Sequence, residues 1–399
     1  MTLSTRVKRL APSFALGIHY RYKEMLRHGR DVVSFGVGEP DFDTPAHIKK
    51  AAVEALEQGY TKYSVTPGFP ELREAICFLL KSRYGLAYDP LSVIVSVGGK
   101  HSIVNAMIAL LEPGDEVLIP IPAWFSYHEP AKLLDGVPVF VPTRKEEEFQ
   151  LKAEAVACRI TPKTKLLLLN TPNNPTGAAM EAEELAKIAD LAVRHGFYII
   201  SDEIYCEIMY DGHKHVSIVN LDPRVKERTI VINGFSKAYA MTGWRVGYAA
   251  GPREVIDAMG AIQGHFTSGT NSMAQRAAIA AVHGPQDCLR EFLCEYDQRR
   301  RYIVQRLNSI PGVSAFSPHG TFYVFPDVSR ALGKTVGGRR ILNSLDLGNY
   351  LLESEGVATV PGSAFEGEGH LRLSFACSMD VIRSGCDRLE SGLKKLMAP

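Results

Sequence analysis

The sequence has no excess of charge of either sign. Its 45 lysine and arginine residues are balanced by 44 aspartate and glutamate residues, so the net charge at pH 7 is +1. A protein that binds nucleic acid usually carries a strongly basic surface, because lysine and arginine neutralise the phosphates. The balance of charge therefore argues against nucleic acid as a partner.

Paired cysteines are also missing. The chain has seven cysteines, an odd number, and they are scattered along the sequence without CxxC spacing. Disulfide frameworks and structural zinc sites need grouped or paired cysteines. We therefore expect neither disulfides nor a metal site, and a reducing cytoplasm fits this cysteine usage.

Long apolar runs are absent as well. No stretch reaches the ~18 apolar residues of a membrane span, and the first thirty residues carry charges throughout instead of the apolar core of a signal peptide. Hydrophobic residues make up 46% of the chain and charged residues 22%, an ordinary globular balance. We expect a soluble cytoplasmic protein without a membrane partner, large enough for about two or three domains.

Short apolar strands and amphipathic helical stretches alternate from about residue 92 to 250. This alternation predicts an α/β fold, in which a mostly parallel sheet has helices on both faces. After about residue 285 a long charged helix leads to short strands, which predicts a smaller α+β domain. We expect residues 1–47 to pack with this small domain, 48–285 to form a large cofactor-binding domain, and 286–399 to form the small domain.

A lysine and an arginine lie between two apolar strands, in "NGFSKAYAMTGWRVGYAAGP". Lys237 and Arg245 follow the strand "TIVIN", and loops beyond the carboxyl ends of parallel strands commonly carry ligand sites. The alternative is that both are solvated surface charges. Partners at other strand ends decide between the two.

Two glycines link a strand to a helix in "SVGGKHSIVN". Gly98 and Gly99 leave backbone N–H groups open at the start of a helix that begins near Lys100, an arrangement that suits a phosphate. The segment matches neither of the common nucleotide-binding glycine patterns. A Gly-Gly turn without any ligand is the alternative.

Two further strands end in groups suited to a flat aromatic ring. Trp124 follows "EVLIPI" and offers a face for stacking, although an aromatic residue there can equally pack in the core. Asn174 lies in "TPNNPTG" after "TKLLLLN", where its amide can donate to a ring oxygen or the segment can serve only as a rigid turn.

An acidic residue ends the strand "FYIISDE". A carboxylate such as that of Asp202 is costly to bury unless it is paired or hydrogen-bonded, so we expect a cationic partner, with an N-cap role as the alternative. A protonated pyridine nitrogen is such a partner, and Tyr205 lies three residues further on.

These groups together describe a pocket for pyridoxal 5'-phosphate (PLP). A lysine amine forms a Schiff base with an aldehyde, an arginine fork binds a phosphate, and a carboxylate holds the proton of a pyridinium. The predicted partners are Lys237 for the aldehyde, Arg245 for the phosphate, Asp202 for the ring nitrogen, Tyr205 and Asn174 for the phenolic oxygen, and Trp124 for the ring face.

Motifs along nearly the whole chain resemble the class I aminotransferases of fold type I. They are "GEPDFDTP", "TKYSVTPGFPELR", "NTPNNPTG", "SDEIY", "SKAYAMTGWRVGY" and "PGSAFEGEGHLRLSFA", and they are most similar to the bacterial aspartate/prephenate aminotransferase branch. The resemblance implies a PLP-dependent aspartate transaminase that works by a ping-pong mechanism with 2-oxoglutarate. A prephenate or aromatic amino acid aminotransferase, and a PLP-dependent C–S or β-lyase, remain as alternatives.

The resemblance also implies roles for single residues. Lys237 is the Schiff-base lysine and the catalytic base, and Arg372 binds the α-carboxylate of the substrate, close to Gly38. The alternative for Arg372 is a surface arginine at a strand edge. Tyr63 reaches across a homodimer to the cofactor phosphate of the neighbouring chain, so that active sites are shared; its alternative is a core or loop tyrosine. Residues expected to contact cofactor or substrate also include Gly99, Lys100, Trp124, Asn174 and Ser236.

Substrate choice rests on fewer residues. Lys100 corresponds to the lysine associated with the distal carboxylate of aspartate, glutamate or prephenate, although a solvent-facing lysine is the alternative. The family's "PSxT" reads "PSFA" here, with Ala15 in place of the threonine and Phe14 beside it. Loss of one neutral hydrogen bond costs about 0.5–1.5 kcal/mol, enough to weaken a preference for dicarboxylates without abolishing it.

Overall fold

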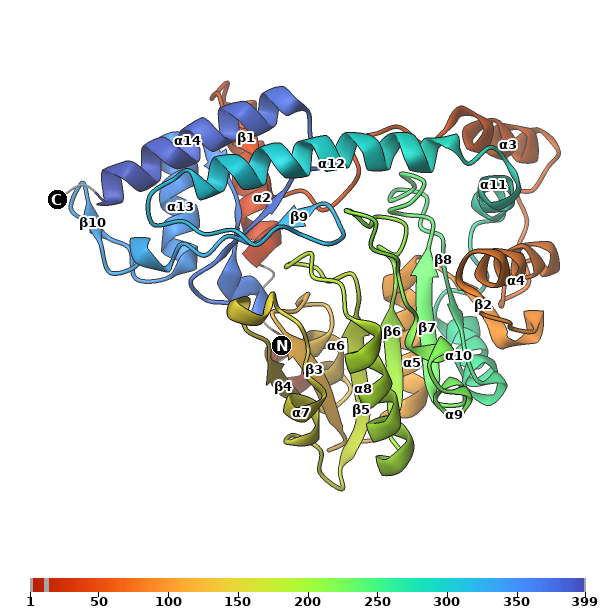
Figure 1. Ribbon diagram of the computed structural model, residues 1–399. Helices are drawn as coiled ribbons and strands as arrows, with labels where there is room; N and C mark the ends of the chain where they lie inside the picture. The colour runs from red at the N-terminus through yellow and green to blue at the C-terminus, as the bar shows by residue number, and fades with distance from the viewer. Residues whose placement is uncertain (1–2, 11–13, 398–399) are drawn as a thin grey trace.

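The fold of the chain is seen in a computed structural model that describes residues 3–10 and 14–397, without the side chains of residues 14–16 and 19. A twisted sheet flanked by helices forms the larger part, and a smaller α+β part lies above it (Figure 1). Helix α12 (Asp287–Asn308) runs along the top of both (Figure 1).

The large sheet has seven strands in the order β2-β8-β7-β6-β5-β3-β4. Strand β8 is antiparallel to both of its neighbours, and every other pair is parallel. The mostly parallel sheet of the predicted α/β fold is therefore confirmed. The strands are β2 (Val93–Ser96), β3 (Glu116–Ile121), β4 (Val137–Pro142), β5 (Thr164–Asn170), β6 (Tyr198–Asp202), β7 (Thr229–Gly234) and β8 (Gly247–Ala250).

Helices cover both faces of this sheet, because successive apolar side chains of each buried strand point to opposite sides. In β5, Leu167 packs in a cluster with α4, α8 and α11, whereas Leu168 packs in a cluster with α5 and α10. The helices of this part are α3 (Ala46–Glu57), α4 (Pro70–Tyr84), α5 (Gly99–Leu110), α6 (His128–Leu133), α7 (Ala153–Ala157), α8 (Ala182–His195), α9 (Pro223–Lys226), α10 (Arg253–Phe266) and α11 (Ser272–His283).

The large sheet contains one strand, β4, that the sequence analysis did not predict. Its segment "VPVFVP" contains Pro138 and Pro142, which lack the N–H that a central strand donates to its ladder. The strand lies at the edge of the sheet and pairs only with β3, so the prolines are tolerated there. Sequence propensity alone underestimates such edge strands.

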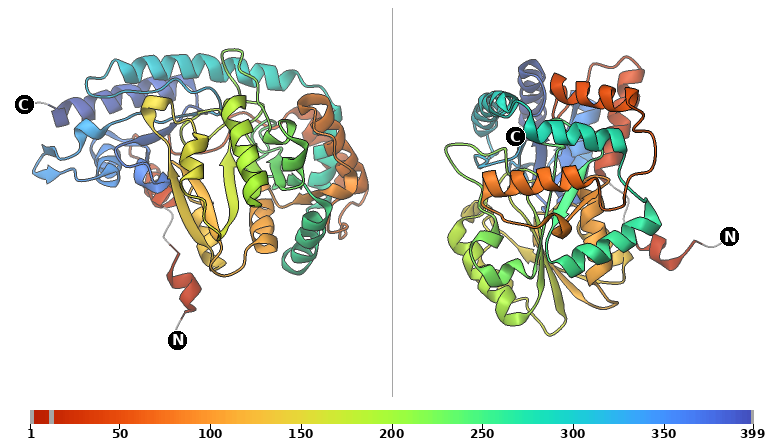
Figure 2. Two further views of the ribbon diagram at one scale, coloured as in Figure 1. Left: turned by 60° about the horizontal axis from the view of Figure 1, so that its bottom comes forward. Right: turned by 90° about the vertical axis from the view of Figure 1, so that its right-hand side faces the viewer.

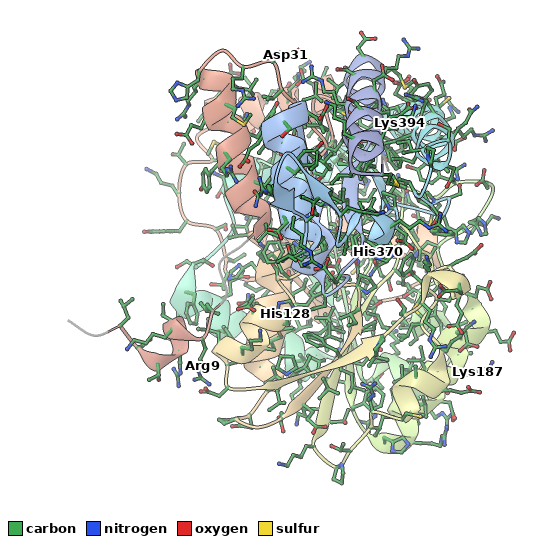
Figure 3. The ribbon with its side chains drawn as sticks, turned by 90° about the vertical axis from the view of Figure 1, so that its left-hand side faces the viewer. Arg9, Asp31, His128, Lys187, His370 and Lys394 are labelled. Carbon is green, nitrogen blue, oxygen red and sulfur yellow. The ribbon has the colours of Figure 1, made fainter. Side chains whose placement is uncertain are left out.

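The smaller part combines both ends of the chain. Strand β1 (Val33–Ser34) pairs in parallel with β12 (Val357–Ala358), and Arg388 of the last helix donates to Asp31 at 2.6 Å. Asp31 and Lys394 lie in this upper part and His128 and Lys187 in the lower part (Figure 3). The remaining elements are α2 (Phe14–Arg27), β9 (Tyr323–Val324), β10 (Thr335–Val336), β11 (Arg339–Arg340), α13 (Ser344–Glu355), β13 (Val360–Pro361), β14 (Leu371–Ser374) and α14 (Met379–Met397). The division at residues 47 and 285 stays a proposal that this arrangement supports.

The short helix α1 (Thr5–Lys8) projects from the larger part of the molecule (Figure 2). Arg6 and Arg9 approach the Asp135 carboxylate to 3.4 and 2.6 Å, which ties this segment to the turn before β4. Among the described residues, no helix combines the length and apolar character needed to cross a membrane.

Candidate active site

A cavity of 450 Å³ lies at the carboxyl ends of the sheet strands, and residues of the smaller part line its other side. It is large enough for a small-molecule ligand. Eleven of the residues singled out from the sequence for cofactor or substrate contact line it, whereas Tyr63 does not. They are Gly38, Gly99, Lys100, Trp124, Asn174, Asp202, Tyr205, Ser236, Lys237, Arg245 and Arg372.

Asp202 ends strand β6 and is only 4% exposed. Its Oδ2 accepts a hydrogen bond from the Tyr127 hydroxyl at 2.8 Å, and its Oδ1 accepts from the Ile204 N–H at 3.2 Å. Burial raises the pKa of this carboxyl to about 6, against the effect of the Tyr127 hydrogen bond. A cation in the cavity would be stabilised by this desolvated carboxylate.

Lys237 follows β7 and points its amine into the same cavity, where Nζ donates to the Gly38 carbonyl at 2.6 Å. Burial lowers the pKa of the amine to about 8; the charges of Arg372 and Arg245 act in the same direction, whereas Glu39 and Asp202 act against it. A lysine amine with a pKa of about 8 is neutral in a substantial fraction of molecules near that pH, so it can act as a nucleophile and a base, unlike an exposed lysine.

Helix α5 begins at this cavity without a side-chain cap. Its N-cap, Gly98, has φ +79°, and a Cβ there would lie 2.6 Å from the Arg245 guanidinium. The glycine therefore lets Arg245 lie against the helix N-terminus, where N–H groups and the helix dipole favour an anion. Ser236 lines the same cavity. This end of the cavity has the donor set that a phosphate requires.

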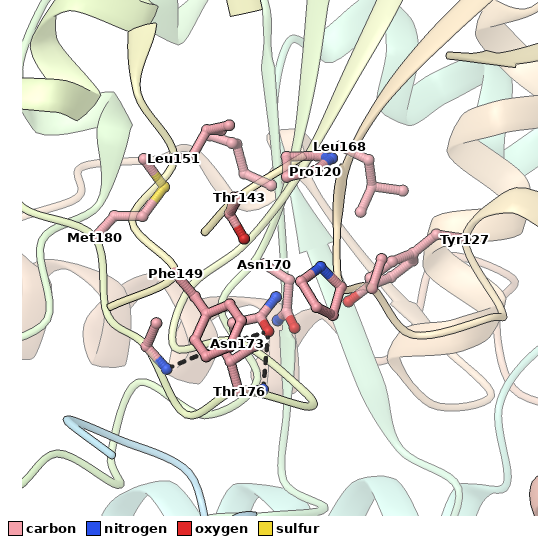
Figure 4. Close-up of a pocket in the computed structure, with 14 residues that line it drawn as sticks. Pro120, Tyr127, Thr143, Phe149, Leu151, Leu168, Asn170, Asn173, Thr176 and Met180 are labelled. Atoms are coloured by element: carbon pink, nitrogen blue, oxygen red, sulfur yellow. Dashed lines mark hydrogen bonds between the residues drawn. The ribbon is translucent and has the colours of Figure 1, made fainter. Parts of the chain in front are cut away.

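Asn174 is held by a rigid turn after β5. Its N–H donates to Asn170 Oδ1 at 2.8 Å, and the Thr176 hydroxyl donates to Asn173 Oδ1 at 2.9 Å. Figure 4 shows the Asn170, Asn173 and Thr176 side chains beside a cavity of 30 Å³, too small for a substrate. The turn fixes the Asn174 amide, which lies in the larger cavity.

Arg372 lies on β14 and is only 5% exposed. Its guanidinium donates to the Gly36 carbonyl at 2.8 Å and to Asn174 Oδ1 at 3.2 Å, and it stacks 4.5 Å from the centre of the Tyr323 ring. Its Nε has no hydrogen-bond partner among the described atoms. A buried guanidinium that faces a cavity with spare donors suits a carboxylate.

Lys100 and Trp124 form one wall of the cavity. The Lys100 amine lies 4.6 Å from the centre of the Trp124 ring, and burial together with the Arg245 charge lowers the pKa of this amine. The pair places a point charge beside a flat aromatic face.

Tyr63 does not join the other predicted residues. It is 97% exposed and lines a separate pocket of 330 Å³ formed by residues 60–64 and 269–273. A tyrosine this exposed contributes nothing to the core of its own chain, which excludes a core tyrosine and leaves a loop tyrosine or a contact with a second chain. The side chains of Phe14 and Ala15 lie outside the described residues.

Sequence reasoning missed two tyrosines of the cavity. Tyr127 lies three residues after Trp124, and only the structure shows its bond to Asp202. Tyr323 comes from β9 of the smaller part, and its hydroxyl lies 3.0 Å from that of Tyr205. Neither has a motif of its own. The one feature of the sequence that could have indicated Tyr127 is its position shortly after the end of strand β3, where ligand-binding residues were expected.

The functional groups that line the cavity fit PLP. It provides an amine for an aldehyde, a buried carboxylate for a pyridinium, and a helix N-terminus with an arginine for a phosphate. In the described part of the chain, no group of three or more histidine, cysteine and acidic residues is placed to hold a metal ion.

Comparison with known proteins gives consistent findings. A family model described as aminotransferase class I and II matches residues 30–389. The chain is 43% identical to an aspartate aminotransferase of Geobacillus stearothermophilus, with 98% of each chain covered. It is also 43% identical to an aspartate/prephenate aminotransferase of Cereibacter sphaeroides, again over 98% of each chain.

The fold agrees with a solved structure. The crystal structure of the aspartate aminotransferase from Rhizobium meliloti superposes with a TM-score of 0.96 at 41% identity, covering 99% of this chain and 100% of that one. The similarity therefore extends over both the large sheet and the smaller part.

Proposed function

The chain belongs to the aminotransferase class I and II family, and we propose that it transfers the amino group of aspartate to 2-oxoglutarate with PLP as its cofactor. Aspartate and 2-oxoglutarate become oxaloacetate and glutamate, and the first product leaves before the second substrate binds. Relatives named aspartate aminotransferase along the full chain support the choice of donor.

One observation carries the proposal: Lys237, Asp202 and Arg372 line a single cavity. A nucleophilic amine, a carboxylate for a pyridinium and a fork for an α-carboxylate are together what amino transfer requires. When bound, PLP supplies an aldehyde for condensation with amines and a protonated ring that withdraws electrons from the substrate Cα.

The residues that would hold PLP come from different strands. We assign Asp202 to the ring nitrogen, Trp124 to the ring face, and Asn174 and Tyr205 to the phenolic oxygen. Arg245, Ser236, Gly99 and the start of α5 are assigned to the phosphate. Cytoplasmic location stays a prediction.

Lys237 carries the proton transfer. With PLP bound, the Lys237 amine would hold the cofactor aldehyde at rest and, once free, would accept the proton from the substrate Cα as the base. Burial favours the neutral amine, which this role requires. The positive charges of Arg372 and Arg245 support the same protonation state.

Substrate binding divides between two cations. Arg372 would bind the α-carboxylate through its planar fork, on the side of the cavity that Gly38 also lines. Lys100, beside Trp124, would face a distal carboxylate. The two charges favour a dicarboxylic amino acid such as aspartate over an aromatic one.

The reaction itself tests the donor. PLP-loaded protein given aspartate and 2-oxoglutarate should form oxaloacetate and glutamate in equal amounts, with parallel double-reciprocal plots. With a cysteine thioether as substrate instead, formation of pyruvate, ammonia and the free thiol without glutamate would support the lyase alternative. Faster transfer from phenylalanine, tyrosine or to prephenate would support the aromatic and prephenate alternatives.

The rate of PLP incorporation should depend on the pH through Lys237. Because only the neutral amine attacks an aldehyde, the rate should rise about tenfold per pH unit below the lysine pKa and level off near pH 8. Stopped-flow mixing of cofactor-free protein with PLP measures this rate from the visible absorption of bound cofactor. A rise that continues to pH 10 would show an amine with an ordinary pKa.

We also propose a homodimer in which Tyr63 of each chain contacts the cofactor phosphate of the other. The 97% exposure of this tyrosine supports the proposal. Tyr63→Phe should weaken PLP affinity about tenfold or more, the cost of one hydrogen bond to a charged group, while Tyr20→Phe, another exposed tyrosine, should not. Equilibrium dialysis measures the affinity and sedimentation the mass. A monomeric protein with unchanged affinity would contradict the proposal.

A further inference from the structure

Tyr323 lies between the residue assigned to the cofactor oxygen and the residue assigned to the substrate carboxylate. Its hydroxyl is 3.0 Å from the Tyr205 hydroxyl, and its ring supports the Arg372 guanidinium at 4.5 Å. Tyr205 is 4% exposed and Tyr323 is 1% exposed, and both line the cavity. No motif in the sequence pointed to this residue.

The direction of the hydrogen bond between the two tyrosines decides what Tyr205 can do. A hydroxyl has one proton to donate and two lone pairs with which to accept. If Tyr205 donates to Tyr323, it presents only lone pairs to an anionic oxygen in the cavity, which is repulsive. If Tyr323 donates to Tyr205, the Tyr205 proton is free for that oxygen.

The surroundings favour Tyr323 as the donor. Burial raises the pKa of both tyrosines, that of Tyr205 well above its usual value. The Arg372 cation lowers the pKa of both, but it ranks second among the influences on Tyr323, whose ring it stacks on, and only fourth for Tyr205. This difference makes the Tyr323 hydroxyl the stronger donor. The Tyr323 hydroxyl also lies against Gly38, where a Cβ would come within 2.8 Å of it. Gly38 therefore leaves the space that this hydroxyl fills.

We propose that Tyr323 is a positioning residue that donates its proton to Tyr205 and thereby directs the Tyr205 proton to the phenolic oxygen of bound PLP. The inference rests on the proposed function, since it requires the cofactor. The hydroxyl of Tyr323 acts on the cofactor through Tyr205, whereas its ring supports Arg372. The two effects belong to different atoms and can be separated by substitution.

Tyr323→Phe removes the hydroxyl and keeps the ring. A hydrogen bond to the phenolic oxygen favours its ionised form, and donation from Tyr323 strengthens that bond cooperatively. Its loss should raise the apparent pKa of the visible absorption of bound PLP by about half a unit. The Michaelis constant for aspartate should stay within about twofold, because the Arg372 support remains.

The sign of the shift is the test. If Tyr205 donated to Tyr323 instead, removing Tyr323 would release the Tyr205 proton to the cofactor, and the apparent pKa would fall. A fall, or no shift beyond that of the control, would overturn the proposal. The control is Tyr296→Phe, because the Tyr296 hydroxyl is equally buried, at 1% exposure, and has no hydrogen-bond partner in the described structure.

A second variant tests the ring. Tyr323→Leu removes both the hydroxyl and the support of Arg372, so it should show the same upward shift together with an increase of about fivefold or more in the Michaelis constant. Equal Michaelis constants for the Phe and Leu variants would overturn the separation of roles. A wild-type protein that acquires no visible absorption with PLP would overturn the proposed function itself, before any variant is compared.

Discussion

Lys237→Ala is expected to lower the transamination rate by about 10⁴-fold or more, because the variant loses both the nucleophilic amine and the base. The Lys237 amine lies in the cavity and donates to Gly38, and among the described residues Lys100 is the one other lysine that lines that space. Steady-state assays with aspartate and 2-oxoglutarate measure the loss, and the visible absorption of bound PLP should shift toward that of the free aldehyde.

Two further variants separate the role of the Lys237 amine as nucleophile and base from the effect of its positive charge. Lys237→Arg keeps the positive charge but cannot lose its proton at neutral pH, so it should be as inactive as the alanine variant. Lys187→Ala, an exposed lysine on α8, should leave the rate unchanged. If Lys237→Ala retained more than a tenth of the wild-type rate, another base would have to be found.

Arg372→Ala should lower kcat/KM for aspartate by about 30- to 4000-fold, the cost of truncating one partner of a buried, hydrogen-bonded charge pair. The guanidinium is buried, and its Nε has no protein partner among the described atoms. Most of the loss should appear in KM, because the residue is assigned to the carboxylate and not to the transferred proton.

The conservative variant guards against a folding defect. Arg372→Lys keeps the charge and loses the planar fork, so it should fold like the wild type and still lose activity, by a smaller factor than the alanine variant. Arg383→Ala removes an exposed arginine on α14 and should have no effect. An Arg372→Lys protein with wild-type KM would show that the carboxylate binds elsewhere.

Many residues of the candidate site could be predicted from the positions at which the strands end. Asp202 ends a buried strand, Asn174 and Trp124 each follow one, and parallel strands of a sheet bring their carboxyl ends to one edge. That reasoning needs only local patterns, namely apolar runs and the polar residue after each. Arg372 was placed by its resemblance to a family motif, since no local pattern joins β14 to the large sheet.

Contacts between the two parts of the chain could not be predicted from the sequence. Tyr323 and Tyr205 are separated by 118 positions, and their hydroxyls meet only because the smaller part packs over the sheet edge. The same limit applies to the Lys237 pKa, which depends on burial and on Arg372 more than a hundred positions away. Edge strand β4 was missed for a different reason, because its prolines oppose strand propensity.

The central claim is that this cavity accepts the amino group of a dicarboxylic amino acid, and a half-reaction scan tests it most directly. PLP-loaded protein is mixed separately with aspartate, glutamate, alanine, tyrosine, phenylalanine and arogenate, and absorbance follows the conversion of bound PLP to its pyridoxamine form. The account predicts fast conversion with aspartate and glutamate, which pair with Arg372 and Lys100, and slower conversion with the others. Conversion that is fast only with the aromatic or aliphatic donors would contradict the proposed specificity, and no conversion with any donor would contradict amino transfer.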